Sequence, residues 1–272
     1  VTTLQYSDRK AVRDAAVAKL QSAATIAKAN TFSTTAAWTG GRSYTSAQIA
    51  QIANTLSAMT LANYPRTPTE AAAVNWAQVL TYTAQGMSGF DFVFVGDGCV
   101  QFCHEILLWF NGIDGGRVHT RVANIIDPAT QATPWPLAGN PPPNSADKRM
   151  GDGSFGDASI VAGFGTNVRT ANGGSDFAYS RDAVFRPSRG SYHQSNIGHV
   201  RYDLTGNQDP SGIYGAFGPA PVITATQNDL LRAEAAIRTG DLATAVTMIN
   251  RTRVGRGGLA PAVAGDGVAG LT

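Results

Sequence analysis

Apolar residues recur at helical spacing near both ends of the chain. Asp8 to Ala29 is rich in alanine and is predicted to form one amphipathic helix. Its expected apolar face consists of Val12, Ala16, Leu20, Ala23 and Ala27. After a loop with Trp38, Gly40 and Gly41, a second helix is predicted to begin at Thr45 or Ser46. Its apolar stripe is Ile49, Ile52, Leu56 and Met59.

A third helix is predicted from the sequence Thr67-Pro68-Thr69-Glu70. Threonine suits the N-cap, proline suits the first helical position, and glutamate three residues on suits the return bond of a capping box. This helix is expected to continue as one piece through Trp76 and Leu80 and to stop by Gly86.

Residues 227–253 predict two short helices joined by a sharp turn. Thr226 is the expected cap of the first, Gly240 its left-handed stop, and Asp241 the cap of the second. Small residues that would let the two helices approach closely are Ala233, Ala235, Ala236 and Ala245. Such a pair cannot bury its apolar face alone, so it is expected to pack on the early helices.

The middle of the chain has a different composition. Of 30 Gly, 21 lie between Gly86 and Pro221, together with 10 of 13 Pro and 10 of 11 Phe. Gly and Pro at this density interrupt helices, while Phe requires a packed environment. We therefore predict a mainly α protein: a helical-repeat block over 1–85, a loop-rich insertion with a few short strands over 86–221, and a helix pair over 222–272 that packs back on the first block.

Three segments resemble the SusD/RagB family. They are the late pair with Arg238-Thr239-Gly240-Asp241 and Gly257-Gly258-Leu259, the early Tyr64-Pro65-Arg66-Thr67-Pro68 with Trp76, and Phe185-Arg186-Pro187 with Tyr192-His193 and Arg201-Tyr202. The family's lipid-anchor cysteine and first helices would lie before Val1, and its charged helix would lie beyond Leu271.

The resemblance implies a tetratricopeptide-like helical scaffold and a non-enzymatic role. Proteins of this family are lipoproteins on the outer-membrane surface of bacteria. They bind oligosaccharides, or sometimes oligopeptides, and deliver them to a SusC-type TonB-dependent transporter. The resemblance also implies that the helices form the transporter contact and that the insertion carries the ligand surface.

Aromatic residues of the insertion are candidates for that surface, because flat rings stack on sugar rings while polar side chains bind hydroxyls. The candidates are Trp109, Trp135, Tyr179, Arg181, Tyr192, Asn196, Tyr202 and Tyr214. Each aromatic taken alone is more often a core residue, so only the set supports the hypothesis.

Other chemistry has weaker support. Cys99 and Cys103 are the only cysteines, and no second Cys/His pair has the spacing of a zinc site, which leaves free thiols or a disulfide. No pair of carboxylates or nucleophile setting is recognisable, so neither an enzyme nor a cofactor is expected. A net charge of +2 disfavours nucleic acid as a partner. An alternative function is a structural scaffold that uses its helices for protein contacts or self-assembly.

Overall fold

The computed structural model describes residues 6–97, 100, 117–133, 140–150, 176–179, 194–199 and 217–272. The described part is mainly helical, with a few short strands, as predicted at that level; the tetratricopeptide-like repeat stays a prediction. The chain divides into two compact units. Unit 1 comprises Val1–Phe94, Pro221–Thr252 and Pro261–Thr272, and unit 2 comprises Val95–Ala220 and Arg253–Ala260.

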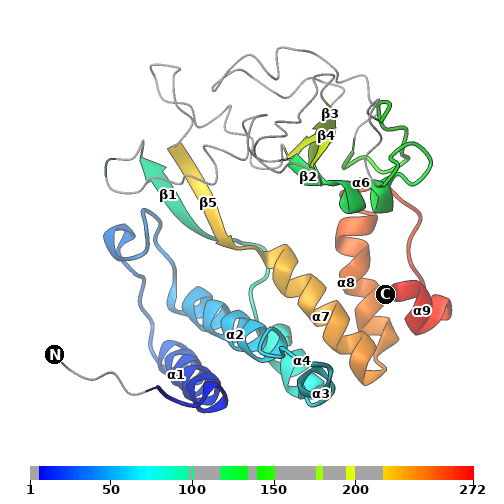
Figure 1. Cartoon of the computed structure of the whole chain (residues 1–272). Coiled ribbons are helices and arrows are strands. Elements are labelled where there is room, and N and C mark those ends of the chain that lie inside the picture. The colour runs from blue at the N-terminus through cyan, green and yellow to red at the C-terminus, as the bar shows by residue number, and fades with distance from the viewer. Residues whose placement is uncertain are drawn as a thin grey trace. The chain divides into compact units, whose positions relative to one another are not determined.

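Unit 1 consists of helices from both ends of the sequence (Figure 1). They are α1 (Arg9–Ala29), α2 (Ser46–Ala62), α3 (Pro68–Ala72), α4 (Trp76–Ala84), α7 (Ala225–Thr239), α8 (Leu242–Arg253) and α9 (Gly267–Leu271). Arg253, the last residue of α8, is assigned to unit 2. In sequence α4 and α7 are far apart, yet they pack together, and α2 contacts α1, α4 and α7. Helix α2 therefore lies at the centre of the unit.

The core of unit 1 is made largely of small residues. Ala24 and Ala27 of α1 pack on Ala50 and Ala53 of α2, which brings these two helices close together. A second cluster contains the predicted stripe of α2, since Ile52 is buried and Ile49, Leu56 and Met59 are partly buried around it. The four alanines predicted to let α7 and α8 approach are all buried. Most of these contacts lie where the helical spacing predicted them.

Helix ends follow local capping chemistry. Thr45 caps α2 and forms a complete capping box with Gln48. Asp8 caps α1 and Asp241 accepts the Thr244 amide at the start of α8. Gly240 adopts the predicted left-handed conformation, with φ 83°.

Four details of the prediction are wrong. Helix α7 begins earlier, because Thr224 rather than Thr226 forms the capping box with Gln227. Asp229, three residues after Thr226, accepts a hydrogen bond from Arg251 of α8 at 2.6 Å. On α1, Val17 and Ala24 are buried whereas Val12 is 55% exposed. The reason is the polar contact of Gln21 with Asn54 and Ser57, which turns Val12, Ala16 and Ala23 outward.

The other two errors concern the third helix. It is not continuous, because Asn75 accepts the Gln78 amide and starts α4 as a separate helix after α3. Thr67 caps α3 as predicted. Glu70, however, does not complete a capping box: its carboxylate accepts the Arg66 amide at 2.7 Å and pairs with Arg9.

Two strands mark the passage between the units. β1 (Phe92–Asp97) pairs with β5 (Phe217–Ile223) in a two-stranded sheet, and Figure 1 draws them running in opposite directions. The chain leaves unit 1 within β1 and returns to it within β5.

Unit 2 contains a three-stranded antiparallel sheet in the order β2-β4-β3. Its elements are β2 (Arg117–His119), α6 (Thr120–Ile126), β3 (Phe177–Tyr179) and β4 (Gln194–His199). Its core cluster is Val118, Ala123, Met150 and Ile197, with Ile126 and Phe177 packed against it.

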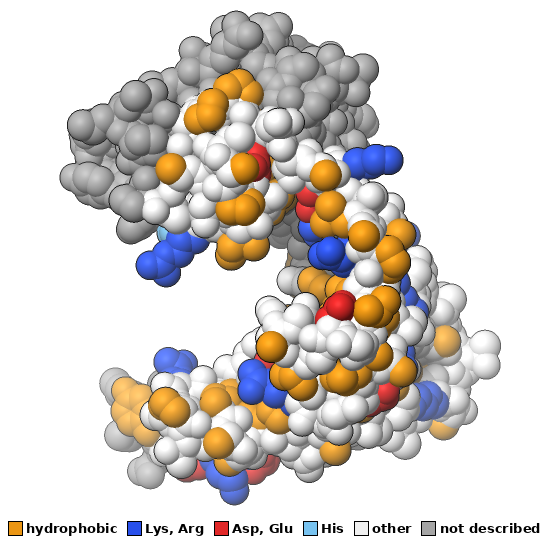
Figure 2. All heavy atoms as spheres, turned by 90° about the vertical axis from the view of Figure 1, so that its right-hand side faces the viewer, with side chains coloured by type: hydrophobic (Ala, Val, Ile, Leu, Met, Phe, Trp, Pro, Cys, Tyr) orange, Lys and Arg blue, Asp and Glu red, His pale blue; other side chains and the backbone are white. Residues whose placement is uncertain are grey.

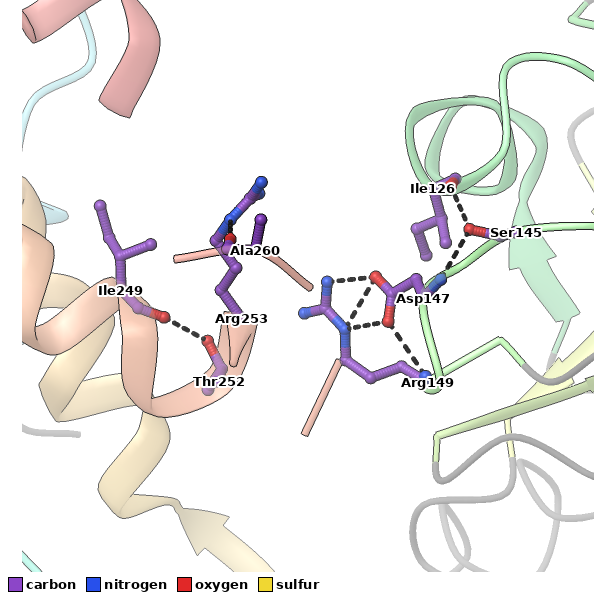
Figure 3. A network of polar contacts seen from close by, with 8 residues as sticks. All are labelled: Ile126, Ser145, Asp147, Arg149, Ile249, Thr252, Arg253 and Ala260. Carbon is purple, nitrogen blue, oxygen red and sulfur yellow. Dashed lines mark hydrogen bonds and ion pairs between the residues drawn. The ribbon is translucent and has the colours of Figure 1, made fainter. Parts of the chain in front are cut away.

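An ion pair stabilises unit 2 beside this cluster. Figure 3 shows Arg149 and Asp147 facing each other in a two-pronged contact, at 2.5 to 3.1 Å between guanidinium nitrogens and carboxylate oxygens. Burial raises the pKa of Asp147, but hydrogen bonds from the Arg149 side chain and amide outweigh it, so the pKa lies below its ordinary value. Ser145 donates to the Ile126 carbonyl and accepts the Asp147 amide, which fixes the loop. The ion pair therefore accounts for the order of this loop, and neither Asp147 nor Arg149 has the features of a catalytic residue.

Candidate functional site

An open groove of about 570 Å³ lies within unit 1, along the N-terminal half of α1. Its polar and aromatic lining residues are Lys10, Arg13, Asp14, Gln21, Tyr64, Glu70, Asn75, Gln78 and Tyr82. Its apolar lining residues are Val17, Ala18, Leu61, Ala73 and Val74. A concave surface lined by both apolar and hydrogen-bonding groups is the usual form of a small-ligand site.

The antiparallel packing of α1 on α2 forms one wall. Gln21 donates to Ser57 at 2.8 Å and to Asn54 at 3.2 Å, which fixes the rotation of α1. That rotation directs Val17 inward, where it is 9% exposed, and leaves Arg13 and Lys10 at the rim, one and two turns before it. The contact of Gln21 with Asn54 and Ser57 therefore explains both this wall and the difference between the predicted and the observed apolar face of α1.

Tyr64 forms the corner of the groove, after α2 ends. The guanidinium carbons of Arg9 and Arg13 lie 4.1 Å and 4.4 Å from its ring centroid. Each such cation–π contact contributes about 0.5–1 kcal/mol at an exposed position. Arg9 also donates to the Tyr64 carbonyl at 2.6 Å, and Arg13 pairs with Asp14 at 2.6 Å. Tyr64 is therefore held in place by two side chains of α1.

Glu70 lies at the start of α3 and lines the same corner. The Arg66 amide, and then the Arg9 side chain, lower the pKa of its carboxyl, because both stabilise the charged form. A general acid for glycoside cleavage needs the opposite shift, toward a raised pKa. Glu70 is thus suited to holding Arg9 in place and poorly suited to proton donation.

The opposite wall comes from α4. Asn75 uses its side-chain oxygen to cap this helix, and Gln78 donates from Nε2 to the Tyr82 hydroxyl at 2.9 Å. Among the described residues, the Asn75 Nδ2, the Gln78 Oε1 and the Lys10 ammonium have no hydrogen-bond partner. One amide donor, one amide acceptor and one cation are therefore free to bind a ligand.

This arrangement fits a neutral or weakly anionic polyol. The amides and the tyrosine hydroxyls match sugar hydroxyls, and the apolar lining residues match the C–H faces of a pyranose ring. Arg13 pairs with Asp14, and Glu70 pairs with Arg9 next to the groove, so only Lys10 adds an unpaired charge among the described lining residues.

Most of the residues predicted from the sequence fall outside the part of the chain that the structure describes. These are Trp109, Trp135, Arg181, Tyr192, Tyr202 and Tyr214, and also Cys99 and Cys103. Tyr179 ends β3 opposite Ile197 of β4, and Asn196 precedes Ile197, so the sheet brings the backbones of this one predicted pair together. Their role as ligand contacts stays a prediction.

Sequence analysis missed the groove residues. The spacing Asn75-x-x-Gln78 repeats a helix-start pattern and could have revealed the break before α4. Arg9 and Arg13, four residues apart, could have been noted as neighbours on one helix face. Nothing in the sequence connects these two signals, because the groove joins segments about 50 residues apart.

In the described ranges, no cluster of three or more His, Cys, Asp and Glu side chains could hold a metal ion. No helix of that same part has the length and apolar character needed to cross a membrane. The face drawn in Figure 2 carries basic, acidic and hydrophobic side chains in small, interspersed groups.

Comparison of the chain with protein-family models, with curated proteins and with solved structures gives no match. The geometry of the groove and the resemblance of the sequence are therefore the grounds for a functional proposal.

Proposed function

We propose that this protein is a non-enzymatic glycan-binding protein of the bacterial cell surface. It binds an oligosaccharide, or alternatively an oligopeptide, and delivers it to a SusC-type TonB-dependent outer-membrane transporter. The uptake role and the location rest on the resemblance to the SusD/RagB family. The ligand class rests in addition on the groove of unit 1.

The observation that carries the proposal is the chemistry of the groove lining. Amide and hydroxyl groups line the groove together with apolar side chains, while every charged lining residue other than Lys10 is engaged in an ion pair. Sugars present many hydroxyls and few charges, so this combination favours them over nucleotides or other strongly anionic ligands. The lowered pKa of Glu70 supports binding without hydrolysis.

Titration calorimetry with defined hexasaccharides tests the proposal. Suitable probes are the β-1,4-glucose, β-1,4-xylose, α-1,4-glucose and α-1,4-galacturonate oligomers. We expect saturable binding of at least one probe, which is recovered intact after long incubation. Absence of binding to all four would contradict the glycan class, and release of shorter sugars would contradict the non-enzymatic role.

Groove variants locate the binding. The double substitution Lys10→Ala with Gln78→Ala removes a cation and an amide from opposite walls, and we expect affinity to fall by about tenfold or more. Lys19→Ala is the matched control, because Lys19 is an exposed lysine of α1 outside the groove lining. Equal affinity of the double variant and the control would exclude the groove as the binding site.

A further inference from the structure

The loop between α1 and α2 exposes the ring of Trp38 to solvent and, to a lesser degree, that of Phe32, which is 39% exposed. Trp38 ends the short 3-10 helix Ala36–Trp38 and is 86% exposed. Burying an indole ring is strongly favourable, so a tryptophan this exposed on an ordered loop calls for a binding partner.

The base of this loop is anchored in the core. Tyr44 is 1% exposed, and its hydroxyl accepts the Val93 amide at 2.8 Å and donates to the Val93 carbonyl at 3.1 Å. Its ring contacts Phe92, which contacts Phe94 edge to face. Gly40 lies directly over Phe94, where a Cβ atom would come within 2.4 Å of the phenyl ring. The aromatic residues below the loop are therefore committed to packing.

The tip of the loop is held by its own hydrogen bonds. The Gly41 amide donates to the Ala36 carbonyl at 2.8 Å, and the Trp38 amide donates to the Thr35 carbonyl at 3.1 Å. The Thr39 hydroxyl contacts the Thr35 carbonyl and the Thr34 hydroxyl. Because the backbone is already fixed, ligand binding at Trp38 costs little ordering entropy.

The surroundings of Trp38 decide between kinds of partner. Its neighbours along the loop are exposed small or polar residues, namely Thr35, Ala36, Ala37, Arg42 and Ser43. A protein interface or a membrane surface would need a broader apolar area than the ring of Trp38 and the less exposed ring of Phe32. An exposed flat ring on a loop that also carries hydroxyl and guanidinium side chains matches a sugar, whose C–H face stacks while its hydroxyls form hydrogen bonds.

We infer that Trp38 is a stacking platform for a pyranose ring, and forms a second carbohydrate contact separate from the groove. This inference rests on the proposed glycan-binding function. Trp38 precedes the first turn of α2, whereas Leu61 and Tyr64 of the groove lie at its other end. The 17 residues of α2 span roughly 25 Å at 1.5 Å per residue. A long glycan is therefore needed to contact both places.

The experiment uses the full chain with its tryptophans replaced by 5-fluorotryptophan. Trp38→Phe assigns the Trp38 signal in the fluorine spectrum, and the four hexasaccharides named above are the probes. We expect the Trp38 signal to shift on adding a probe that binds, Trp38→Ala to weaken binding about tenfold, and Trp38→Phe to retain most of it. Ile26→Ala is the control, since Ile26 is an exposed apolar residue of α1 at 59% exposure.

The outcomes separate this inference from the proposed function. Binding by the wild type with an unmoved Trp38 signal and unchanged affinity of Trp38→Ala would overturn the inference and leave the proposed function intact. Lack of binding of every probe by the wild type would overturn both. Loss of affinity in Trp38→Ala with an unchanged melting temperature supports the platform.

Discussion

At the scale of single residues, Asn228 joins three helices of unit 1 through one buried amide. Its Oδ1 accepts the Thr55 hydroxyl at 3.0 Å, and its Nδ2 donates to the carbonyls of Thr83 and Met87 at 3.0 and 3.2 Å. The Thr55 hydroxyl in turn accepts the Met87 amide at 2.8 Å. Buried polar groups are costly when unpaired, so this network acts as one unit.

Replacing this amide tests the network. Asn228→Leu has a similar size but leaves the Thr83 and Met87 carbonyls without this donor, and we expect the free energy of unfolding to fall by about 2–4 kcal/mol. Urea unfolding followed by circular dichroism measures it. Asn63→Ala, which removes an exposed amide just after α2, is the control and should change stability by less than about 0.5 kcal/mol. Equal effects of the two variants would contradict the account.

Gly86 is required by the same network. A Cβ atom at this position would lie 2.2 Å from the Asn228 Oδ1 and 2.6 Å from the Thr55 hydroxyl. We expect Gly86→Ala to destabilise the protein by about 1–3 kcal/mol, because the buried side chains have little room to move. Gly265→Ala, where a Cβ atom meets nothing within 4 Å, should be nearly neutral in the same thermal melts. A neutral Gly86→Ala would mean that the network relaxes freely.

At the scale of elements, the pairing of α3 with α1 through Glu70 and Arg9 should depend on pH. Folding lowers the pKa of Glu70 below its ordinary 4.5. Its contribution to stability is therefore fully present above that value and is lost as the pH falls through the lower, folded-state pKa. We expect Glu70→Gln to be less stable than the wild type at pH 7, and the difference to shrink below about pH 4.5.

Unfolding of both proteins between pH 7 and pH 3 measures this difference. A carbon-13 titration of the Glu70 carboxyl gives an independent value of its pKa. A stability difference that stays constant with pH, or a pKa above 4.5, would exclude the assigned role of the Arg66 amide and Arg9.

The helices also show which features of the fold can be predicted from the sequence and which cannot. Helix starts at Asp8, Thr45, Thr67 and Asp241 were predictable, because capping depends on bonds within one turn. The start of α7 was not, because Thr226 and Asp229 have the same spacing as Thr224 and Gln227. The choice between the two depends on Arg251 of α8, because its hydrogen bond to Asp229 engages that carboxylate away from the start of α7. The face of α1 likewise depends on Asn54 and Ser57 of α2.

The candidate site was less predictable than the fold. The concentration of aromatic residues in 86–221 led to the prediction of a ligand site there, with Tyr179 among its residues. The groove instead lies among the helices of unit 1. Its walls come from α1 and from residues 61–82, and only the tertiary packing brings them together. Composition indicates where aromatic residues are numerous, but it does not indicate where a concave surface forms.

At the scale of the whole molecule, unit 1 is made from segments that flank a long intervening stretch. The antiparallel pairing of β1 and β5 holds these two segments together where the chain leaves unit 1 and where it returns. We expect a chain in which residues 98–216 are replaced by a short Gly/Ser linker to keep its helical circular dichroism and to melt cooperatively, because the core clusters of unit 1 are retained. A gradual, non-cooperative melt would contradict the autonomy of unit 1.

The most direct test of the central claim is a map of ligand-induced shifts in the backbone and side-chain amides of the nitrogen-15-labelled chain. The claim is that a glycan binds in the groove of unit 1. With a hexasaccharide that calorimetry shows to bind, the account predicts saturating shifts at the amides of Gln21, Asn75 and Gln78, with the affinity measured by calorimetry. Binding that leaves these three residues unshifted, while residues of unit 2 such as Tyr179 and Asn196 respond, would contradict it.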